Sequence, residues 1–304
     1  MILTVTLNPA VDKTCSIQEL LLGQVNRLKY VQSIAGGKGV NVTRVLRQFD
    51  YPVTAMGFLG GYSGRLIEDT LKDMGVNCCF TWIKQETRVS TNILAEDGCV
   101  TEILEPGPEI TKEELSAFLE EYWKQLPACE WIVISGSIPK GVPADIYGKL
   151  IQWAKEQDKK VLLDTSGEPL RLAAEAGPYL VKPNQKELES LVGRKLETIE
   201  EIQTEAERLL TKGIEKVVVS LGQKGLLYVD ASDSIFQKAY PVTAVNTVAC
   251  GDTVVASYCM SEISGVSREI AVRNAAAMAA ANATTEVSAR IPIEVYEKIR
   301  EKVF

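Results

Sequence analysis

The 304-residue sequence contains no histidine. This absence excludes Ser-His-Asp and Cys-His nucleophilic sites, histidine-ligated metals and histidine general bases. Any acid–base chemistry must therefore use aspartate, glutamate, lysine, tyrosine or cysteine. Basic residues are also in the minority, since the formal net charge is −7. This charge argues against nucleic-acid binding, which needs a basic surface, so a site for an anion must be built from local Lys, Arg and backbone N–H groups.

Long apolar runs and paired cysteines are also missing. No stretch approaches the ~20 apolar residues that a membrane-spanning helix needs, so we expect no membrane association. Residues 1–8 carry no basic segment before a short apolar run, which is not typical of a signal peptide. The seven cysteines are scattered and lack C-x-x-C spacing, so neither a disulfide framework nor a zinc site is indicated. We therefore expect a cytoplasmic protein.

What is present is an ordinary globular composition, 46% hydrophobic and 24% charged, with apolar runs that alternate with amphipathic stretches of helical length. Continuous apolar strands that alternate with helices are typical of a parallel sheet covered on both faces, so the sequence predicts an α/β fold. A capping box at Thr111–Glu114 opens one helix. The other predicted elements are strands at Ile2–Leu7, Val53–Phe58, Trp131–Ser135, Val161–Asp164, Tyr179–Lys182 and Lys216–Ser220, and helices at Ile146–Gln157, Ile199–Lys212 and Ile270–Thr285.

Two segments, Asp12–Ile34 and Thr87–Glu105, differ from this pattern. Both consist of short alternating segments, and Asp97-Gly98 marks a turn in the second. They are predicted to form a small antiparallel sheet, a lid, inserted into a single α/β domain that spans residues 1–304. An apolar sheet face needs covering, so we expect a homodimer formed through the lid.

A glycine-rich segment, Ala35–Val42, precedes a helical pattern. Its three glycines let the backbone approach a ligand closely, and a helix N-terminus offers N–H donors to an anion. Lys38 adds a positive charge and Asn41 a polar amide. The spacing matches neither the Walker A pattern nor the dinucleotide fingerprint. A loop that needs glycines only for its turns is an equally good interpretation of this segment alone.

Small residues lead into an apolar helical run at Asn246–Thr253. Successive backbone N–H groups at such a turn can form an anion hole for a phosphoryl group in transfer. Asp252 would lie at the start of the helix and accept a proton from an attacking hydroxyl. On this segment alone, a helix-capping role for Asp252 is the stronger interpretation.

Two further motifs follow predicted strands. Val181–Glu187 lies at the C-terminal end of a strand, where open α/β sheets bind ligands. Its Asn184 and Glu187 offer oxygen ligands suited to Mg²⁺, often through water, or else form a capping box. Val219–Gly225 is a glycine-flanked turn that can hold nucleotide phosphates or ribose, or is a plain hairpin turn. Taken singly, both motifs are better explained by the structural interpretation.

The order and spacing of these motifs together resemble the ribokinase-like sugar kinases, in particular the PfkB (phosphofructokinase-B-type) branch. Within it, the chain is most similar to 1-phosphofructokinases and tagatose-6-phosphate kinases, over essentially its whole length. The resemblance implies a doubly wound, mostly parallel sheet with helices on both faces, plus the small lid. Further stretches that carry it are Thr4–Asp12, Thr87-Arg88, Thr101–Pro108, Ser135–Pro139 and Val181–Asn184.

The resemblance also implies a reaction, which is transfer of a phosphoryl group from ATP, with Mg²⁺, to fructose 1-phosphate to give fructose 1,6-bisphosphate. Tagatose 6-phosphate or fructose 6-phosphate is the alternative acceptor, and a catalytically weak sensor of nucleotide or sugar phosphate is an alternative of another class. Asp252 would be the base, and the backbone N–H groups of Ala249, Cys250, Gly251 and Asp252 would form the anion hole beside it. The other implied contacts are Asp12, Arg27, Gly37, Lys38, Asn41 and Arg88 for the sugar phosphate, Lys182, Asn184, Ser220, Gly222, Gly225 and Asn282 for ATP, and Asn184 and Glu187 for Mg²⁺ through water.

The sequence departs from the family at the motif that contains the implied base. The family pattern is Gly-Ala-Gly-Asp or Gly-Ser-Gly-Asp, whereas this chain has Ala249-Cys250-Gly251-Asp252. Ala249 replaces a glycine that is expected to need a backbone conformation unfavourable for other residues, at a cost of ~1 kcal/mol or more. Cys250 at a helix start is expected to have a lowered thiol pKa and to be reactive. Because Gly251 and Asp252 remain, we expect the chemistry to survive.

Overall fold

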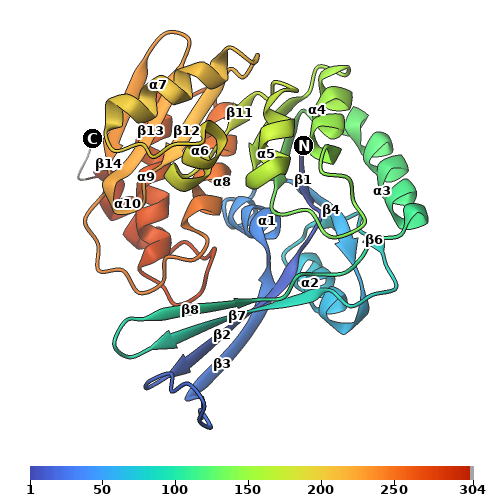
Figure 1. The fold of residues 1–304 in the computed structure, drawn as a ribbon, viewed down its shortest axis with the longest axis vertical. Helices are drawn as coiled ribbons and strands as arrows, with labels where there is room; N and C mark the ends of the chain where they lie inside the picture. The colour runs from blue at the N-terminus through green and yellow to red at the C-terminus, as the bar shows by residue number, and fades with distance from the viewer. Residues whose placement is uncertain (302–304) are drawn as a thin grey trace.

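The computed structural model describes residues 1–301, which form two sheets and the helices around them (Figure 1). The larger sheet consists of β1 (Ile2–Thr6), β4 (Val53–Leu59), β5 (Asn77–Cys78), β6 (Thr81–Trp82), β9 (Trp131–Ser135), β10 (Lys160–Asp164), β11 (Leu180–Val181), β12 (Lys216–Ser220), β13 (Gly225–Asp230) and β14 (Ser234–Lys238). Their order is β14-β13-β12-β11-β10-β9-β1-β4-β5, with β6 paired to β4. The pairs β12–β13 and β13–β14 are antiparallel and the others are parallel.

Helices cover both faces of this sheet (Figure 1). They are α1 (Lys38–Gln48), α2 (Gly61–Asp73), α3 (Lys112–Gln125), α4 (Ile146–Lys155), α5 (Gly167–Ala174), α6 (Gln185–Val192), α7 (Ile199–Leu210), α8 (Cys250–Ile263), α9 (Arg268–Ala283) and α10 (Ile293–Glu301). The apolar faces of α3 to α7 pack on one side of the sheet, and those of α1, α8, α9 and α10 pack on the other. Within residues 1–301, none of these helices has both the length and the apolarity needed to cross a bilayer.

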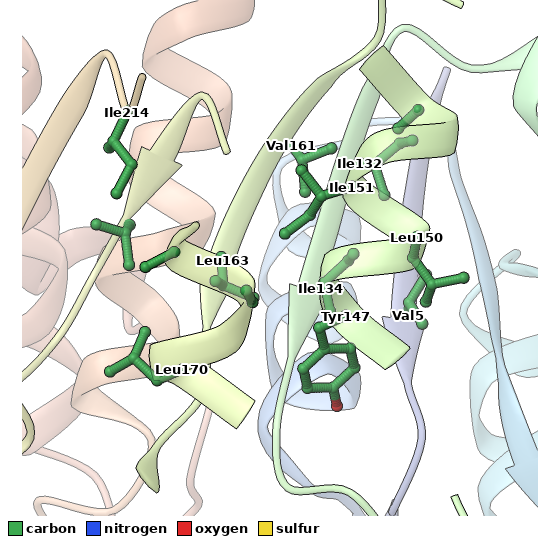
Figure 2. Close-up of a cluster of buried hydrophobic side chains, with 14 of the residues drawn as sticks. Val5, Ile132, Ile134, Tyr147, Leu150, Ile151, Val161, Leu163, Leu170 and Ile214 are labelled. Atoms are coloured by element: carbon green, nitrogen blue, oxygen red, sulfur yellow. The ribbon is translucent and has the colours of Figure 1, made fainter. Parts of the chain in front are cut away.

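The central strands supply side chains to both layers of the core. Ile132 and Ile134 of β9 pack in the cluster that contains Tyr147 and Leu150 of α4 (Figure 2). The alternate residue Val133 belongs to the opposite cluster with α1 and α8. All five residues of β9 are buried, which is why this strand forms a continuous apolar run rather than an alternating one.

Most predicted elements are confirmed, and the differences lie at their ends. The strands Trp131–Ser135 and Lys216–Ser220 have the predicted bounds. The capping box is also present, since Thr111 Oγ1 accepts the Glu114 N–H and the Glu114 carboxylate accepts the Thr111 N–H. The strand predicted at Tyr179–Lys182 is shorter, because only Leu180 and Val181 pair with both neighbouring strands.

A second sheet, here called the small sheet, projects from the α/β core (Figure 1). It contains β2 (Ala10–Ile17), β3 (Tyr30–Gly36), β7 (Arg88–Ala95) and β8 (Val100–Leu104), in the order β3-β2-β7-β8. Its two hairpins, β2–β3 and β7–β8, are antiparallel, and they join through a parallel β2–β7 pair. The predicted turn at Asp97-Gly98 connects β7 to β8. The small sheet meets the core where β1 ends, so it stands beside the C-terminal edge of the parallel strands.

The pairing of β1 with β4 yields a first prediction, on stability. Gly57 of β4 lies opposite Thr6 with a φ of 149°. A Cβ at this position would lie 1.8 Å from the Thr6 carbonyl oxygen. Because the neighbour is backbone, we expect Gly57→Ala to lower the free energy of unfolding by roughly 2–4 kcal/mol, measured by urea denaturation.

Gly148→Ala in α4 is the matched control. A Cβ there meets its nearest neighbour, the Leu172 carbonyl oxygen, at an ordinary 3.6 Å. Helix propensity therefore predicts a gain of up to about 1 kcal/mol. Equal stability of the two variants would contradict this account of the β1–β4 contact.

Candidate active site

A cleft of about 560 Å³ lies between the C-terminal edge of the larger sheet and the small sheet. Asp164 and Ser220 line it from the strand ends, and Asp12 and Asn92 from the small sheet. A second hollow of about 470 Å³ shares Asn184 and Ser220 with the cleft, so the two adjoin. Each volume is within the range of small-molecule sites.

Asp252 lies in the first turn of α8, at the wall of the cleft. Ala249 occupies the N-cap position, so the helix-capping interpretation of Asp252 is wrong. The Asp252 carboxylate instead accepts a 2.9 Å hydrogen bond from Asn41 Nδ2. Burial raises the pKa of Asp252 to about 6, and the nearby Asp164 carboxylate adds to this rise, whereas Lys38 and Asn41 oppose it. Asp252 is therefore a buried carboxylate that is mainly ionised at neutral pH.

Asp164 is the main site residue that the sequence analysis missed. It is fully buried, and its Oδ1 lies 3.1 Å from Lys38 Nζ and 3.3 Å from Lys182 Nζ. Burial alone would raise the pKa of Asp164, but Lys182 and Lys38 outweigh it and hold that pKa below its ordinary value. Asp164 ends a predicted strand, and this position at the C-terminal edge of a parallel sheet is the signal that was available.

Asn184 and Glu187 form the capping box of α6, as the structural interpretation predicted. Asn184 Oδ1 accepts the Glu187 N–H at 2.9 Å, and Glu187 Oε2 accepts the Asn184 N–H at 2.8 Å. The other carboxylate oxygen, Glu187 Oε1, does not take part in the capping box and lies 3.8 Å from Lys38 Nζ. Oxygen atoms so placed fit a Mg²⁺ ion that keeps most of its waters. Clusters of three or more side chains that could ligate a metal directly do not occur in residues 1–301.

Asp12 and the glycine motif form the end of the cleft next to the small sheet. A Cβ on Gly36 would lie 2.1 Å from the Asp12 carboxylate, and Gly37 has a φ of 89° at the N-cap of α1. These glycines therefore serve both the turn and the close approach of a carboxylate. Burial raises the pKa of Asp12 to about 6, against the effect of neighbouring cations and N–H donors.

Arg88 and Asn8 extend this end of the cleft, and both line it. The Arg88 guanidinium donates to the Asn8 carbonyl oxygen at 3.2 and 3.3 Å and to Ser90 Oγ at 3.4 Å. Asn8 Nδ2 donates to Ser137 Oγ at 3.1 Å. Asn8 and Ser137 were not predicted as site residues, although both lie in stretches that carry the family resemblance.

Six predicted site residues do not line the cleft, namely Arg27, Glu187, Gly222, Gly225, Cys250 and Asn282. Arg27 is exposed in the connection between β2 and β3, at the outer end of the small sheet. Asn282 is buried, where its Nδ2 donates to the Val248 carbonyl oxygen and its Oδ1 accepts the Ala289 N–H, both at 2.9 Å. Gly225 is required by strand pairing, because a Cβ there would lie 2.0 Å from the Gln237 carbonyl oxygen. Ser220 lines both hollows and Gly222 the second one.

The two departures from the family motif have opposite outcomes. Ala249 has a φ of 65°, which confirms the left-handed conformation expected there. The expected reactive thiol at Cys250 is wrong, because burial raises its pKa rather than lowering it, and the charge of Asp252 adds to this rise. Cys250 Sγ lies 3.3 Å from Asn282 Nδ2 and 3.4 Å from the Ala279 carbonyl oxygen. Cys250 is therefore a hydrogen-bonded thiol that packs against α9 at the start of α8.

Comparisons with known proteins bear on this arrangement. A model of the pfkB family of carbohydrate kinases matches residues 5–294. The chain belongs to this family. It is 36% identical over 275 residues to a 1-phosphofructokinase of Bacillus subtilis (strain 168), covering 90% of this chain and 88% of that protein. The family makes the protein a phosphotransferase with an alcohol group as acceptor.

Solved structures confirm the ribokinase-like fold. Phosphofructokinase-2 from Escherichia coli, in complex with substrates and products, superposes with a TM-score of 0.92 at 30% identity, over 99% of this chain and 98% of that one. A ribokinase from Arabidopsis thaliana, complexed with ribose and ATP, gives a TM-score of 0.78 at 24% identity, over 98% and 97% of the two chains. The mostly parallel sheet with a separate small sheet is thus the fold that the sequence predicted.

Proposed function

We propose that the protein transfers the γ-phosphoryl group of ATP to a hydroxyl of fructose 1-phosphate, which gives fructose 1,6-bisphosphate. The observation that carries this proposal is a single cleft lined by a buried carboxylate, Asp252, and by the cations Lys38, Lys182 and Arg88. The similarity to a 1-phosphofructokinase favours fructose 1-phosphate over tagatose 6-phosphate and fructose 6-phosphate. Asp12 and Asn41 would bind sugar hydroxyls, while Lys38 and Arg88 would bind the phosphate already present.

Asp252 is proposed as the base that takes the proton of the attacking hydroxyl. A carboxylate with a pKa of about 6 is ionised at neutral pH, yet it is more basic than an exposed aspartate. The hydrogen bond from Asn41 fixes its orientation at 2.9 Å. Phosphoryl transfer depends mainly on positioning and on charge stabilisation, so a fixed base is what the reaction requires.

The N-terminus of α8 is proposed to stabilise the group in transfer. The first main-chain hydrogen bond of α8 joins the Thr253 N–H to the Ala249 carbonyl oxygen at 2.9 Å. The N–H groups of Gly251 and Asp252 lie before Thr253 in the chain, so this bond does not use them. The Cys250 N–H is bonded to the Thr247 carbonyl oxygen at 3.3 Å, so we assign the anion hole to the N–H groups of Gly251 and Asp252 in the first turn of α8. Lys182 lies against Gly251, where a Cβ would be 3.4 Å from its Nζ.

The adjoining hollow is proposed to hold the phosphates of ATP, with Asn184, Ser220 and Gly222 on its wall. Mg²⁺ bound through water at Asn184 and Glu187 would supply positive charge to these phosphates. The small sheet is proposed to act as a lid, since Asp12, Ser90 and Asn92 face the cleft from it. Closure of the small sheet would exclude water and limit hydrolysis of ATP.

The role of Asp252 can be tested with Asp252→Asn. We expect kcat to fall roughly 100- to 10,000-fold, the usual contribution of a general base, measured by coupled detection of ADP. The variant should be at least as stable as the parent at neutral pH, because the raised pKa makes the ionised form cost about 3 kcal/mol. In the parent, kcat should fall as the pH drops below about 6, where Asp252 takes up a proton. Turnover near the parent level would refute the assignment.

The acceptor can be identified with a panel of fructose 1-phosphate, fructose 6-phosphate and tagatose 6-phosphate. We expect the highest kcat/KM for fructose 1-phosphate, and a KM that rises roughly 10-fold or more in Arg88→Met, since a charge-assisted contact is lost. Arg171→Met is the control, because Arg171 pairs with Glu168 on the surface of α5. Tight ligand binding without ADP release would instead support a sensor.

We also propose a homodimer that covers the small sheet. Apolar residues are exposed along its hairpins, and the exposed fraction is 89% for Leu22 and 80% for Val25. A single chain leaves this apolar surface in water, which favours self-association. Sedimentation should show a dimer that Val25→Asp dissociates and that Tyr62→Asp, an equally exposed position on α2, leaves intact. A monomeric parent would exclude this assembly.

A further inference from the structure

Two arginines of α1, Arg44 and Arg47, lie three positions apart in different surroundings. Within residues 1–301, Arg47 donates to the carbonyl oxygens of Met74 at 3.0 Å and Tyr51 at 2.9 Å, and neither residue lines the cleft. Arg44 is buried, with 8% of its surface exposed. Its Nη1 lies 3.2 Å from the Ala35 carbonyl oxygen and 3.4 Å from Asn41 Oδ1. A charge is thus buried behind the cleft, where it touches a residue of the site.

Asn41 is the residue through which Arg44 reaches the cleft. Asn41 Nδ2 donates to Asp252 Oδ2 at 2.9 Å, and the same side chain lowers the pKa of Asp12, which lies on the same side of the amide. An asparagine amide has donors at one end and an acceptor at the other. Only its NH₂ end can face two carboxylates. If the amide turned over, its oxygen would face both carboxylates and its NH₂ group would face the Arg44 guanidinium.

We propose that Arg44 is a positioning residue for phosphoryl transfer, because its guanidinium holds Asn41 Oδ1 and so directs the Asn41 NH₂ group to Asp12 and Asp252. The kinetic consequences of this inference rest on the proposed function. The orientation of the amide does not, since it follows from the contacts of Arg44 and Asn41 alone.

The charge of Arg44 acts on Asp12 as well. Burial raises the pKa of Asp12 to about 6, and the largest opposing effect comes from Arg44, ahead of the Gly37 N–H and Arg88. Burial in turn lowers the pKa of Arg44 to about 10, against the attraction of Asp12. Loss of Arg44 would leave Arg88 of β7 as the main cation facing Asp12. The pKa of Asp12 would then rise further, so Asp12 would take up its proton at a higher pH.

Asp252 is surrounded by a different set of charges. Lys38 of α1 and Lys182, which follows β11, lower its pKa, while Asp164 of β10 raises it. Arg44 is not among the largest influences on the pKa of Asp252, so its removal should act on Asp252 mainly through the orientation of Asn41. The pKa of Asp12 therefore measures the effect of the Arg44 charge. The value of kcat measures the effect of Arg44 on the orientation of the Asn41 amide.

The test compares Arg44→Met with Arg47→Met, the same substitution one helical turn away. We expect Arg44→Met to lower both kcat and kcat/KM for fructose 1-phosphate roughly 10- to 100-fold. The acidic limb of its pH profile of kcat/KM, to which Asp12 contributes, should move up by roughly one pH unit. The Asp12 pKa, followed by ¹³C NMR of carboxyl-labelled aspartate and assigned with Asp12→Asn, should rise in parallel. Arg47→Met should lose thermal stability, yet keep kcat/KM within about twofold and the same pH profile.

Arg44→Lys separates charge from geometry. Lysine keeps the positive charge but lacks the planar guanidinium, so the Asp12 pKa should stay near that of the parent while kcat recovers only in part. If Arg44→Met fails to fold, the test rests on Arg44→Lys. A kcat of Arg44→Lys equal to that of the parent would overturn the positioning role of Arg44.

An unchanged Asp12 pKa together with an unchanged pH profile in folded Arg44→Met also overturns the proposal. Failure of the proposed function would look different, since the parent would then phosphorylate none of the three sugar phosphates. The NMR titration of Asp12 would still decide whether Arg44 acts on this carboxylate.

Discussion

Three carboxylates, Asp12, Asp164 and Asp252, are kept out of water at one edge of the larger sheet. An unpaired buried charge is costly, so the surrounding elements must supply cations and N–H donors. They supply them unequally. Asp164 lies between two lysine ammonium groups, which hold its pKa low, whereas Asp252 receives one amide and has a pKa of about 6. Unequal surroundings give like side chains different properties, since Asp164 holds two cations while Asp252 keeps the raised pKa that suits the proposed base.

The need to compensate these buried negative charges explains why elements from distant parts of the chain meet at this edge of the sheet. Lys38 and Asn41 come from the first turn of α1, and Asp252 from the first turn of α8, 211 residues along the chain from Asn41. The two helices lie on the same face of the sheet and start at the same edge, so their N-termini converge. Gly39 lets the start of α1 lie close to the end of β1, since a Cβ there would lie 2.2 Å from Thr6 Oγ1. The glycine motif therefore serves packing as well as the ligand binding proposed for it.

The local pattern of apolar residues was enough to predict the strands and helices, because a buried strand such as β9 is apolar along almost its whole length. The family resemblance was needed to bring Asp12, Lys38, Asn41 and Asp252 together. Asp164 was missed although it ends a predicted strand, because its two lysine partners are remote in sequence. Arg44 was not predicted either, since its proposed role depends on an amide orientation that no periodicity reveals. The expectation for Cys250 was wrong for a related reason. A helix N-terminus favours a thiolate, but burial and the nearby Asp252 charge oppose it, and neither is a local property.

The Ala249-Cys250 departure is compatible with catalysis because the surrounding contacts restrain the loop. A left-handed alanine costs ~1 kcal/mol or more, which a folded structure can hold when its neighbours fix the backbone. Here Asn282 binds the Val248 carbonyl oxygen and Ala289, and the Thr253 N–H binds the Ala249 carbonyl oxygen. Asn282 therefore supports the site from behind rather than lining it. The strain falls on Ala249, whereas the N–H groups that would meet a phosphoryl group belong to Gly251 and Asp252, so the substitution leaves the reacting positions intact.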